Sequence, residues 1–438
     1  MNLSVHDLIA HRLSATPGLI AERHGSVDLA AVGWERMRIV LEHLGNPQYA
    51  QRTIHIAGSK GKGTTAHLSA ALLRAGGLRT GLFTSPHIDQ WNERISLTGA
   101  AIDEDLFVTV LQEAEAAISA VEVNRPDLGT GNAFELLTAA AMLAFRATNV
   151  DIAVVETGLG GRFDSTNHLR SAVTVLTRIE REHVEILGPS LADIVWNKVG
   201  ILQEAVPVVV QEQIPEVAAG IRSAADETGA PIWWQNQQWR IEQVGGGCRF
   251  EGPGGAISFN TVPLPGNHNL ANLGEALCAC QLAVPDLALT SAVASAAASH
   301  FAIPGRFEVI MMGQRSVVLD VAHTPESVAN VLRTATAHFA VDHVPVMLAT
   351  VVDKPAHEIL RAMRPWLGRL ILPIVHHPRM APADDLAAAA SQLGIGADLA
   401  TNVEEALDML RGERYCVATG SFAIVHDLHN LHRRRFQK

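Results

Sequence analysis

The stretch Ile54-His-Ile-Ala-Gly58-Ser-Lys-Gly61-Lys62-Gly63-Thr64-Thr65 decides the fold. It reads as a strand that runs into a glycine-rich turn and then into a helix. Glycines let the backbone wrap a phosphate, a helix N-terminus points amides at it, and a lysine supplies opposite charge. The strict Walker pattern is not met, because residue 56 is Ile and Gly63 separates Lys62 from Thr64. The stretch predicts a nucleotide-binding loop; a merely glycine-rich turn is the alternative.

Around this loop, short β-branched runs alternate with segments of helical period, which is typical of βαβ units around a parallel sheet. We expect strands at Arg52–Ala57, Leu78–Thr84, Ile152–Glu156, Ala172–Thr177 and Val206–Val210. We expect helices at Thr64–Ala75, Glu104–Val121, Phe134–Ala147, Asn269–Ala283 and Thr290–His300. Short alternating runs broken by glycines predict a small antiparallel elaboration at Trp239–Val244, Cys248–Glu251 and Ala256–Phe259.

The run Ile303-Pro-Gly-Arg-Phe307 interrupts the helical pattern and is interpreted as an interdomain hinge. Because 438 residues exceed the usual domain size of roughly 150, we expect two α/β domains, residues 1–302 and 303–438. In the second, we expect strands at Ser316–Val321, Val344–Thr350, Arg369–Pro373 and Tyr415–Ala418. Helices are expected from Pro325, Ala356 and Phe422, with only helical stretches between Pro373 and Leu410.

Composition narrows the class of protein. Hydrophobic residues make up 48% and charged residues 18%, which predicts a folded, globular chain. With 34 Lys and Arg against 45 Asp and Glu, the net charge of −11 argues against a nucleic-acid partner. No stretch reaches the roughly 18 apolar residues that span a bilayer, so we expect no membrane contact. The four scattered cysteines are interpreted as reduced thiols of a cytoplasmic protein.

Further motifs follow the loop in order along the chain. They are Glu35-Arg-Met-Arg, Leu44-Gly-Asn-Pro-Gln, Thr84-Ser-Pro-His87, Asn92-Glu-Arg-Ile95, Phe134-Glu-Leu-Leu-Thr138, Glu156-Thr-Gly-Leu-Gly-Gly-Arg162-Phe-Asp164-Ser-Thr-Asn167, Glu182-His183, Asn197-Lys198, Leu264-Pro-Gly-Asn-His268, Pro304-Gly-Arg306, Leu319-Asp320-Val-Ala-His323, Pro378-Arg379 and Thr419-Gly-Ser421. The ordered set is far more specific than any one member.

With these motifs, the loop Gly58–Thr64 resembles the G-T-N-G-K-G-S loop of the folylpolyglutamate synthase and dihydrofolate synthase family, a branch of the Mur ligases. The resemblance spans nearly the whole chain. It implies a P-loop-containing, Mur-ligase-like N-terminal ATPase domain with a parallel-rich sheet, and a C-terminal Rossmann-like α/β domain. It also implies an ATP-dependent amide ligase: ATP phosphorylates a carboxylate, and the amino group of an amino acid attacks the acyl phosphate.

The resemblance assigns roles residue by residue. It gives catalytic roles to Lys62, Lys198 and His183, and magnesium, at up to two sites, to Ser85, Glu156 and His183. ATP contacts fall to Ser59, Lys60, Gly61, Lys62, Gly63, Thr64, Asn272, Arg306 and Asp320. Loops facing the pterin are matched by Asn132, Ala133, Phe134, Glu135, Phe163, Asp164 and Ser165, and the incoming amino acid by His323 and Ser421. Lys198 resembles a lysine that this family carbamylates.

Departures from the family pattern leave alternatives open. Lys60 adds a positive charge beside the phosphates, Asn197 replaces a glutamate, and Val321 and Thr324 replace a glycine and an asparagine near the amino-acid site. The leading hypothesis is L-glutamate addition to a pterin or folate-type carboxylate by a monomer. A related ligase for a non-folate carboxylate or another amino acid is the second reading, and a non-catalytic nucleotide-binding protein is the third.

Overall fold

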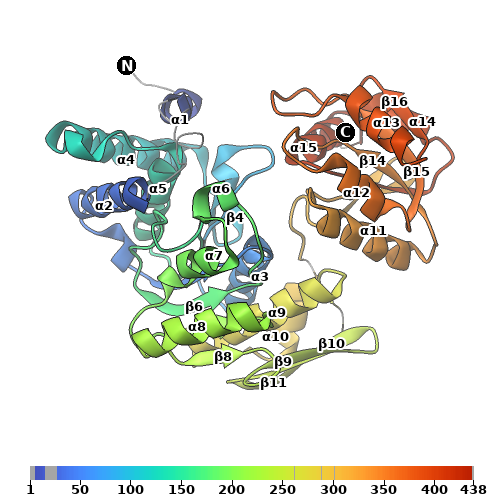
Figure 1. Cartoon of the computed structure of the whole chain (residues 1–438). Coiled ribbons are helices and arrows are strands. Elements are labelled where there is room, and N and C mark those ends of the chain that lie inside the picture. Colours follow the sequence, from blue (N-terminus) through green and yellow to red (C-terminus); the bar gives the residue numbers. More distant parts are fainter. Residues whose placement is uncertain (1–4, 15–26, 261, 288, 300, 437–438) are drawn as a thin grey trace. The chain divides into compact units, whose positions relative to one another are not determined.

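A computed structural model describes residues 5–14, 27–260, 262–287, 289–299 and 301–436 (Figure 1). The chain divides into two compact units: Met1–Val262 with Asn267–Phe301, and Pro263–Gly266 with Ala302–Lys438. Within the described ranges, no helix combines the length and the apolar character needed to cross a membrane.

The first unit contains an eight-stranded sheet in the order β4-β3-β2-β5-β1-β6-β7-β8. The six strands from β2 to β8 in this order are parallel, and β3 and β4 form an antiparallel edge. Their bounds are β1 Arg52–Ala57, β2 Thr80–Phe83, β3 Ile95–Leu97, β4 Ala100–Ala101, β5 Ile152–Glu156, β6 Ser171–Leu176, β7 Val208–Val210 and β8 Ile232–Trp234.

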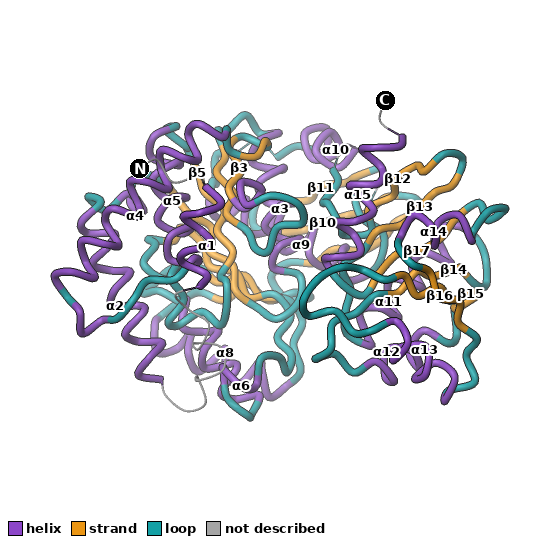
Figure 2. Tube along the Cα trace, turned by 90° about the horizontal axis from the view of Figure 1, so that it is seen from above, coloured by secondary structure: helices purple, strands orange, loops and turns teal. Residues whose placement is uncertain are grey.

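Helices cover both faces of this sheet, which explains why the central strands β1, β5 and β6 are buried along nearly their whole length (Figure 2). All five residues of β5 are buried. One core packs α1, α2, α4 and α5, and the other packs α3, α9 and α10. The helices of this unit are α1 Val5–Ser14, α2 Val27–His43, α3 Lys62–Ala75, α4 Glu104–Asn124, α5 Ala133–Ala147, α6 Val184–Leu187, α7 Leu191–Lys198, α8 Pro215–Thr228, α9 Asn267–Ala283 and α10 Ser291–Ser299.

A separate three-stranded antiparallel sheet, in the order β11-β10-β9, packs on α9 and α10. Its strands are β9 Arg240–Val244, β10 Gly247–Gly252 and β11 Gly255–Phe259. It confirms the expected antiparallel elaboration. The four cysteines are buried and free of disulfides, as expected.

The second unit holds a six-stranded sheet in the order β12-β13-β17-β14-β15-β16, parallel except for the edge strand β12. The strands are β12 Glu308–Met312, β13 Arg315–Leu319, β14 Val344–Leu348, β15 Leu367–Pro373, β16 Ala397–Ala400 and β17 Tyr415–Thr419. The helices are α11 Pro325–Phe339, α12 Ala356–Met363, α13 Ala383–Gln392, α14 Val403–Met409 and α15 Phe422–Phe436.

The predicted α/β class with a parallel-rich sheet and a second sheet unit is confirmed, and β1 and β5 have the predicted bounds. The prediction of only helical stretches between Pro373 and Leu410 is wrong, because β16 pairs with β15 there. Only one of the four residues of β16 is buried, so the strand lacks the apolar run of a buried strand. β12 was also not predicted. His300, the expected end of a helix, lies outside the described residues.

Candidate active site

The glycine-rich turn joins the carboxyl end of β1 to the start of α3. β1 lies between β5 and β6, so the turn sits at the edge of a parallel sheet where such folds bind ligands. Gly58 and Gly61 have φ of 147° and 94°, a region that favours glycine. A Cβ at Gly58 would lie 1.9 Å from the Thr177 hydroxyl oxygen. The backbone here is therefore open only to glycine.

The segment that follows β6 fixes the shape of the turn. The amides of Ser59 and Lys60 donate to the Arg178 carbonyl, at 2.9 and 3.1 Å. The Ser59 hydroxyl donates to the Glu180 carbonyl at 2.9 Å and accepts from the Glu180 amide. The turn is thus held at the N-terminus of α3, whose amides and dipole favour an anion.

Two lysines converge on one carbonyl of the turn. The ammonium groups of Lys62 and Lys198 donate to the Gly58 carbonyl at 2.9 and 2.7 Å. Lys198, at the end of α7, is 1% exposed and also donates to Glu182 at 2.8 Å. Burial, and then the charge of Lys62, lower the pKa of Lys198 to about 8. The pKa of Glu182 is lowered because the charges of Lys198 and Lys62 outweigh its burial.

A carboxylate from β5 lies beside the turn. The Glu156 side chain is buried, and its Oε2 accepts from the Ser85 amide at 3.1 Å. A Cβ on Gly63 would lie 3.4 Å from this oxygen, which places Glu156 against the start of α3. Glu156, Ser85 and the turn thus come together from three different segments, as predicted.

The fit of these residues to Mg²⁺ follows from their chemistry. A carboxylate and a hydroxyl are the oxygen donors that Mg²⁺ prefers, with waters and phosphate oxygens completing its shell. His183 is exposed and starts α6 with a φ of 48°. Over the described part of the chain, no group of three or more His, Cys, Asp or Glu side chains could hold a metal. Glu156 and Ser85 fit Mg²⁺ better than His183 does.

A buried carboxylate, that of Asp164, holds the predicted loop at Phe163–Ser165 in shape through hydrogen bonds. Asp164 accepts from the Leu159 amide at 2.9 Å and from the Thr166 hydroxyl at 2.6 Å. Thr166 in turn contacts His55 of β1 at 2.8 Å. Burial raises the pKa of Asp164, opposed by these hydrogen bonds. Asp164 shapes the loop, and its neighbours Phe163 and Ser165 are partly buried.

The other predicted pterin loop, Asn132–Glu135, begins α5. The Asn132 side chain caps this helix by accepting from the amides of Phe134 and Glu135, at 2.9 and 3.0 Å. The buried Glu135 carboxylate pairs with Arg36 at 2.6 Å. Ala133 is buried too. Asn132 and Glu135 therefore serve the local fold. Phe134 is partly buried, as Asn132 is, and its ring lies 5.6 Å from that of Phe83.

In the second unit, the predicted residues gather at the carboxyl ends of β13 and β17. Asp320 accepts from the amides of Phe307 and Ala322, at 2.8 and 2.9 Å. Burial raises the pKa of Asp320, opposed by the charge of Arg306. The Arg306 guanidinium lies 5.8 Å from the ring centroid of Phe422.

The predicted amino-acid contacts lie on the same edge. His323 Nδ1 donates to the Val321 carbonyl of its own loop at 2.9 Å. The buried Ser421 hydroxyl accepts from the Ile424 amide at 3.3 Å, at the start of α15. Thr324 caps α11 with a reciprocal hydrogen-bond pair to Ser327. Thr324, which stands where the family pattern has an asparagine, therefore stabilises the start of α11.

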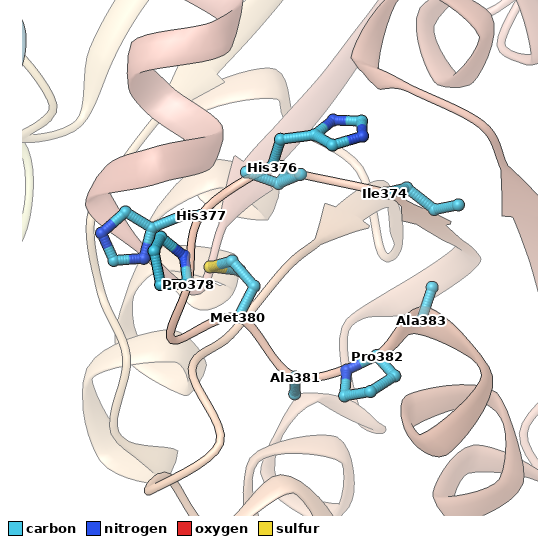
Figure 3. Close-up of a pocket in the computed structure, with 9 residues that line it drawn as sticks. Ile374, His376, His377, Pro378, Met380, Ala381, Pro382 and Ala383 are labelled. Atoms are coloured by element: carbon cyan, nitrogen blue, oxygen red, sulfur yellow. The ribbon is translucent and has the colours of Figure 1, made fainter.

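A pocket of about 340 Å³ follows β15 in this unit (Figure 3). Its lining lies between Ile374 and Ala383, omits Arg379, and includes His376, His377 and Met380. The predicted site residues do not line it. The motif Pro378-Arg379 lies in this loop, and the Arg379 carbonyl accepts from the Val352 amide at 3.0 Å.

Sequence reasoning missed several groups that the structure brings to the turn. In the sequence, Glu182 was noted only as part of the motif Glu182-His183, without a role, yet it pairs with Lys198. Gln211 and Glu275 were not noticed, although Gln211 donates to both Asn272 and Glu275. Their only signal in the sequence is a polar side chain in an apolar stretch: Gln211 directly follows β7, and Glu275 lies within α9.

A P-loop at the edge of a parallel sheet, followed by a second α/β unit, is the arrangement of a Mur-type ligase, and comparison with known proteins agrees. Residues 56–280 match the Mur ligase middle domain, and residues 305–422 match the Mur ligase, glutamate ligase domain. The chain belongs to the folylpolyglutamate synthase and dihydrofolate synthase family of Mur ligases. The predicted family and the predicted class of enzyme, a ligase, are confirmed.

Individual relatives cover most of the chain. It is 30% identical to dihydrofolate synthase/folylpolyglutamate synthase of Bacillus subtilis, over 81% of this chain and 84% of that protein. It is 33% identical to folylpolyglutamate synthase of Lacticaseibacillus casei, over 76% and 79%. Mycobacterium tuberculosis folylpolyglutamate synthase, solved with ADP and AMPPCP, superposes with a TM-score of 0.84 and 29% identity over 97% and 99% of the chains.

Proposed function

We propose that this protein uses ATP to join L-glutamate to a folate-type carboxylate through an acyl phosphate. The observation that carries the proposal is the convergence of Lys62 and Lys198 on the Gly58 carbonyl at the start of α3. The triphosphate and the acceptor carboxylate repel each other, so their approach needs fixed positive charge. The names of the relatives supply the class of acceptor and the amino acid.

Different residues of the first unit are proposed to bind the phosphates, the metal and the pterin. The turn Ser59–Thr64 and the α3 amides bind the phosphates, and Lys62 moves from the Gly58 carbonyl to the phosphate oxygens. Glu156 and Ser85 would hold Mg²⁺, which supplies charge neutralisation on the transferred phosphoryl group. His183 is proposed as a further ligand, and the loops containing Phe134 and Phe163 as the contacts of the pterin ring.

Lys198 is proposed as a site of carbamylation. A neutral amine is required for its nitrogen to bond to carbon dioxide with loss of a proton, and a pKa of about 8 makes this form accessible. The carbamate would stand beside the Glu182 carboxylate, which now lies 2.8 Å from Nζ. Two adjacent anions need a cation between them, and this supports a second metal position.

We assign ATP binding to domain 1–302 and the incoming amino acid to domain 303–438. Asn272 is proposed to contact the base, and Arg306 and Asp320 the phosphates and the ribose. His323 and Ser421 would face glutamate. The substrates are small molecules, and we propose a monomer; the four buried, unbridged cysteines support a reducing compartment such as the cytoplasm.

Phosphate release tests the proposal. ATP, Mg²⁺ and L-glutamate are incubated with dihydropteroate, with tetrahydrofolate or without acceptor. We expect release only when a pterin acceptor and glutamate are both present, with a product heavier by one glutamyl residue. Release that is independent of both substrates, or none with either acceptor, contradicts the proposal. The acceptor that reacts identifies the step that this enzyme serves.

A further inference from the structure

A buried polar cluster lies behind the P-loop and connects α3, β7 and α9. Its members are Thr65, Gln211, Asn272 and Glu275, and none is more than 6% exposed. Gln211 follows the last residue of β7, while Asn272 and Glu275 lie one turn apart on α9. Such a cluster is costly to bury unless its hydrogen bonds are made.

In this cluster, Gln211 and Thr65 donate hydrogen bonds, and Asn272 and Glu275 accept them. Gln211 Nε2 donates to Asn272 Oδ1 and to Glu275 Oε2, both at 2.8 Å. The Thr65 hydroxyl also donates to Glu275 Oε2, at 3.2 Å. Both hydrogens of the Gln211 amide are therefore used, and Glu275 acts as the acceptor that fixes the direction of this amide.

The Asn272 amide also packs directly on the nucleotide-binding turn. A Cβ on Gly61 would lie 2.5 Å from Asn272 Oδ1 and 3.2 Å from Nδ2. Because Oδ1 accepts from Gln211, Nδ2 is the atom of this amide that offers hydrogens to a ligand. An adenine ring nitrogen accepts such a hydrogen bond, whereas the exocyclic amino group of adenine donates and would be rejected.

We propose that Gln211 and Glu275 are positioning residues that hold the Asn272 amide with Nδ2 toward an acceptor nitrogen of the nucleotide base. This inference rests on the proposed function, in which Asn272 contacts the base. Neither Gln211 nor Glu275 needs to touch the nucleotide. Their effect should appear in the affinity for the base and not in the affinity for the phosphates.

The test exchanges the two positioning side chains. In the double variant Gln211→Glu with Glu275→Gln, the composition and charge of the cluster stay the same. The carboxylate introduced at position 211 would offer only acceptor oxygens to Asn272, so Asn272 must turn its Nδ2 inward and present Oδ1 to the base. Titration calorimetry with Mg·ADP measures base and phosphate contacts together, and Mg·tripolyphosphate measures the phosphate contacts alone.

We expect the exchange to weaken Mg·ADP binding about tenfold, equivalent to about 1.4 kcal/mol, and to change tripolyphosphate binding less than twofold. In turnover, KM for ATP should rise by a similar factor while kcat stays within threefold. Equal affinity for Mg·ADP in the wild type and the exchanged variant overturns the inference. A wild type that binds neither probe overturns the proposed function itself.

Two further variants keep the test decisive. If the exchanged variant does not fold, Gln211→Ala takes its place with the same two probes and the same expected result. Gln203→Ala removes another glutamine of the first unit, which bridges the Ser171 amide and the Leu169 carbonyl. It should lower the unfolding midpoint and leave Mg·ADP affinity unchanged. An equal loss of affinity in Gln203→Ala would show a general structural effect and overturn the inference.

Discussion

At the carboxyl edge of the first unit's sheet, two lysine ammonium groups share the Gly58 carbonyl, and one of them is 1% exposed. At the corresponding edge of the second unit, the buried carboxylate of Asp320 is held by two backbone amides, and Ser421 accepts from the amide of Ile424. Both edges are polar and belong to parallel strands.

The difference lies in what the polar groups do before a ligand arrives. In the first unit, like charges are concentrated against each other, and the pKa of Lys198 falls to about 8. In the second unit, the Asp320 carboxylate and the Ser421 hydroxyl already accept hydrogen bonds from nearby backbone amides. The first edge therefore concentrates positive charge, which a phosphoryl-transfer site requires. The second edge holds its polar side chains in fixed positions, as a binding site does.

The largest expected effect tests the charge of the first edge. Lys62→Ala should lower ATP-dependent turnover by roughly 10³-fold, because it removes a charge from the phosphates. Steady-state phosphate release measures this. Lys60→Ala is the matched control, since it removes the same charge two residues away, and we expect a loss of about tenfold. Turnover like that of the wild type in Lys62→Ala would contradict the P-loop assignment.

Next in size is the effect of the buried lysine. Lys198→Ala should lower kcat by roughly 10²-fold, and added acetate or bicarbonate should restore part of it by supplying the missing carboxylate. Lys198→Arg keeps the positive charge but cannot form the carbamate, so it should remain slow. An unchanged rate in Lys198→Ala would remove Lys198 from the mechanism.

A smaller effect is expected at the second edge. Asp320→Asn keeps the size of the side chain but exchanges one acceptor oxygen for an NH₂ group, which faces the amide of Phe307 or of Ala322. We expect KM for ATP to rise about tenfold, with a modest fall in the unfolding midpoint. Kinetics and thermal unfolding of the same preparation check this. A loss in kcat as large as that of Lys198→Ala would erase the distinction between the two edges.

The smallest expected effect concerns acid stability of the first unit. Burial lowers the pKa of His55 to about 3, from 6.5 when unfolded. The unfolded chain therefore binds more protons below pH 6.5, and stability falls as the pH drops from 6.5 toward 3. Between pH 6.5 and 5, His55 should account for a loss of about 1.5 kcal/mol in the free energy of unfolding.

Urea unfolding at these two pH values measures the loss. His55→Gln should reduce the difference between them, whereas the same change at the exposed His43 should leave it as in the wild type. If the difference is the same in His55→Gln, the buried imidazole is not its source.

Patterns local in sequence were sufficient for much of the fold. β1 and β5 are almost wholly buried and rich in β-branched and other apolar residues, which indicates their bounds, and the glycine turn between β1 and α3 indicates the site. The predicted bounds of β6 and β7 began one or two residues off, because strand ends lack a distinct pattern. β16 could not be predicted, since only one of its four residues is buried and its pairing with β15 stabilises it.

Local patterns could not predict which side chains of the site contact one another, because these contacts join residues far apart in the sequence. Lys198 meets Gly58 across 140 residues, and Gln211 meets Glu275 across 64. Their partners follow from how strands are ordered in the sheet, and periodicity does not encode that order. The family resemblance grouped Lys62, Glu156 and Ser85. They lie near one another because Glu156 ends β5, Ser85 follows β2 and Lys62 begins α3 after the turn, all at the carboxyl edge of the sheet.

The central claim is that the acceptor carboxylate is activated by phosphorylation at the P-loop edge. It is tested most directly with the reactive pterin acceptor labelled with ¹⁸O in its carboxylate, together with ATP, Mg²⁺ and L-glutamate. An acyl phosphate transfers one carboxylate oxygen to phosphorus, and the amine then displaces phosphate that carries this oxygen. We predict one ¹⁸O in the released phosphate and a product heavier by one glutamyl residue. Unlabelled phosphate accompanying the same product would contradict the account.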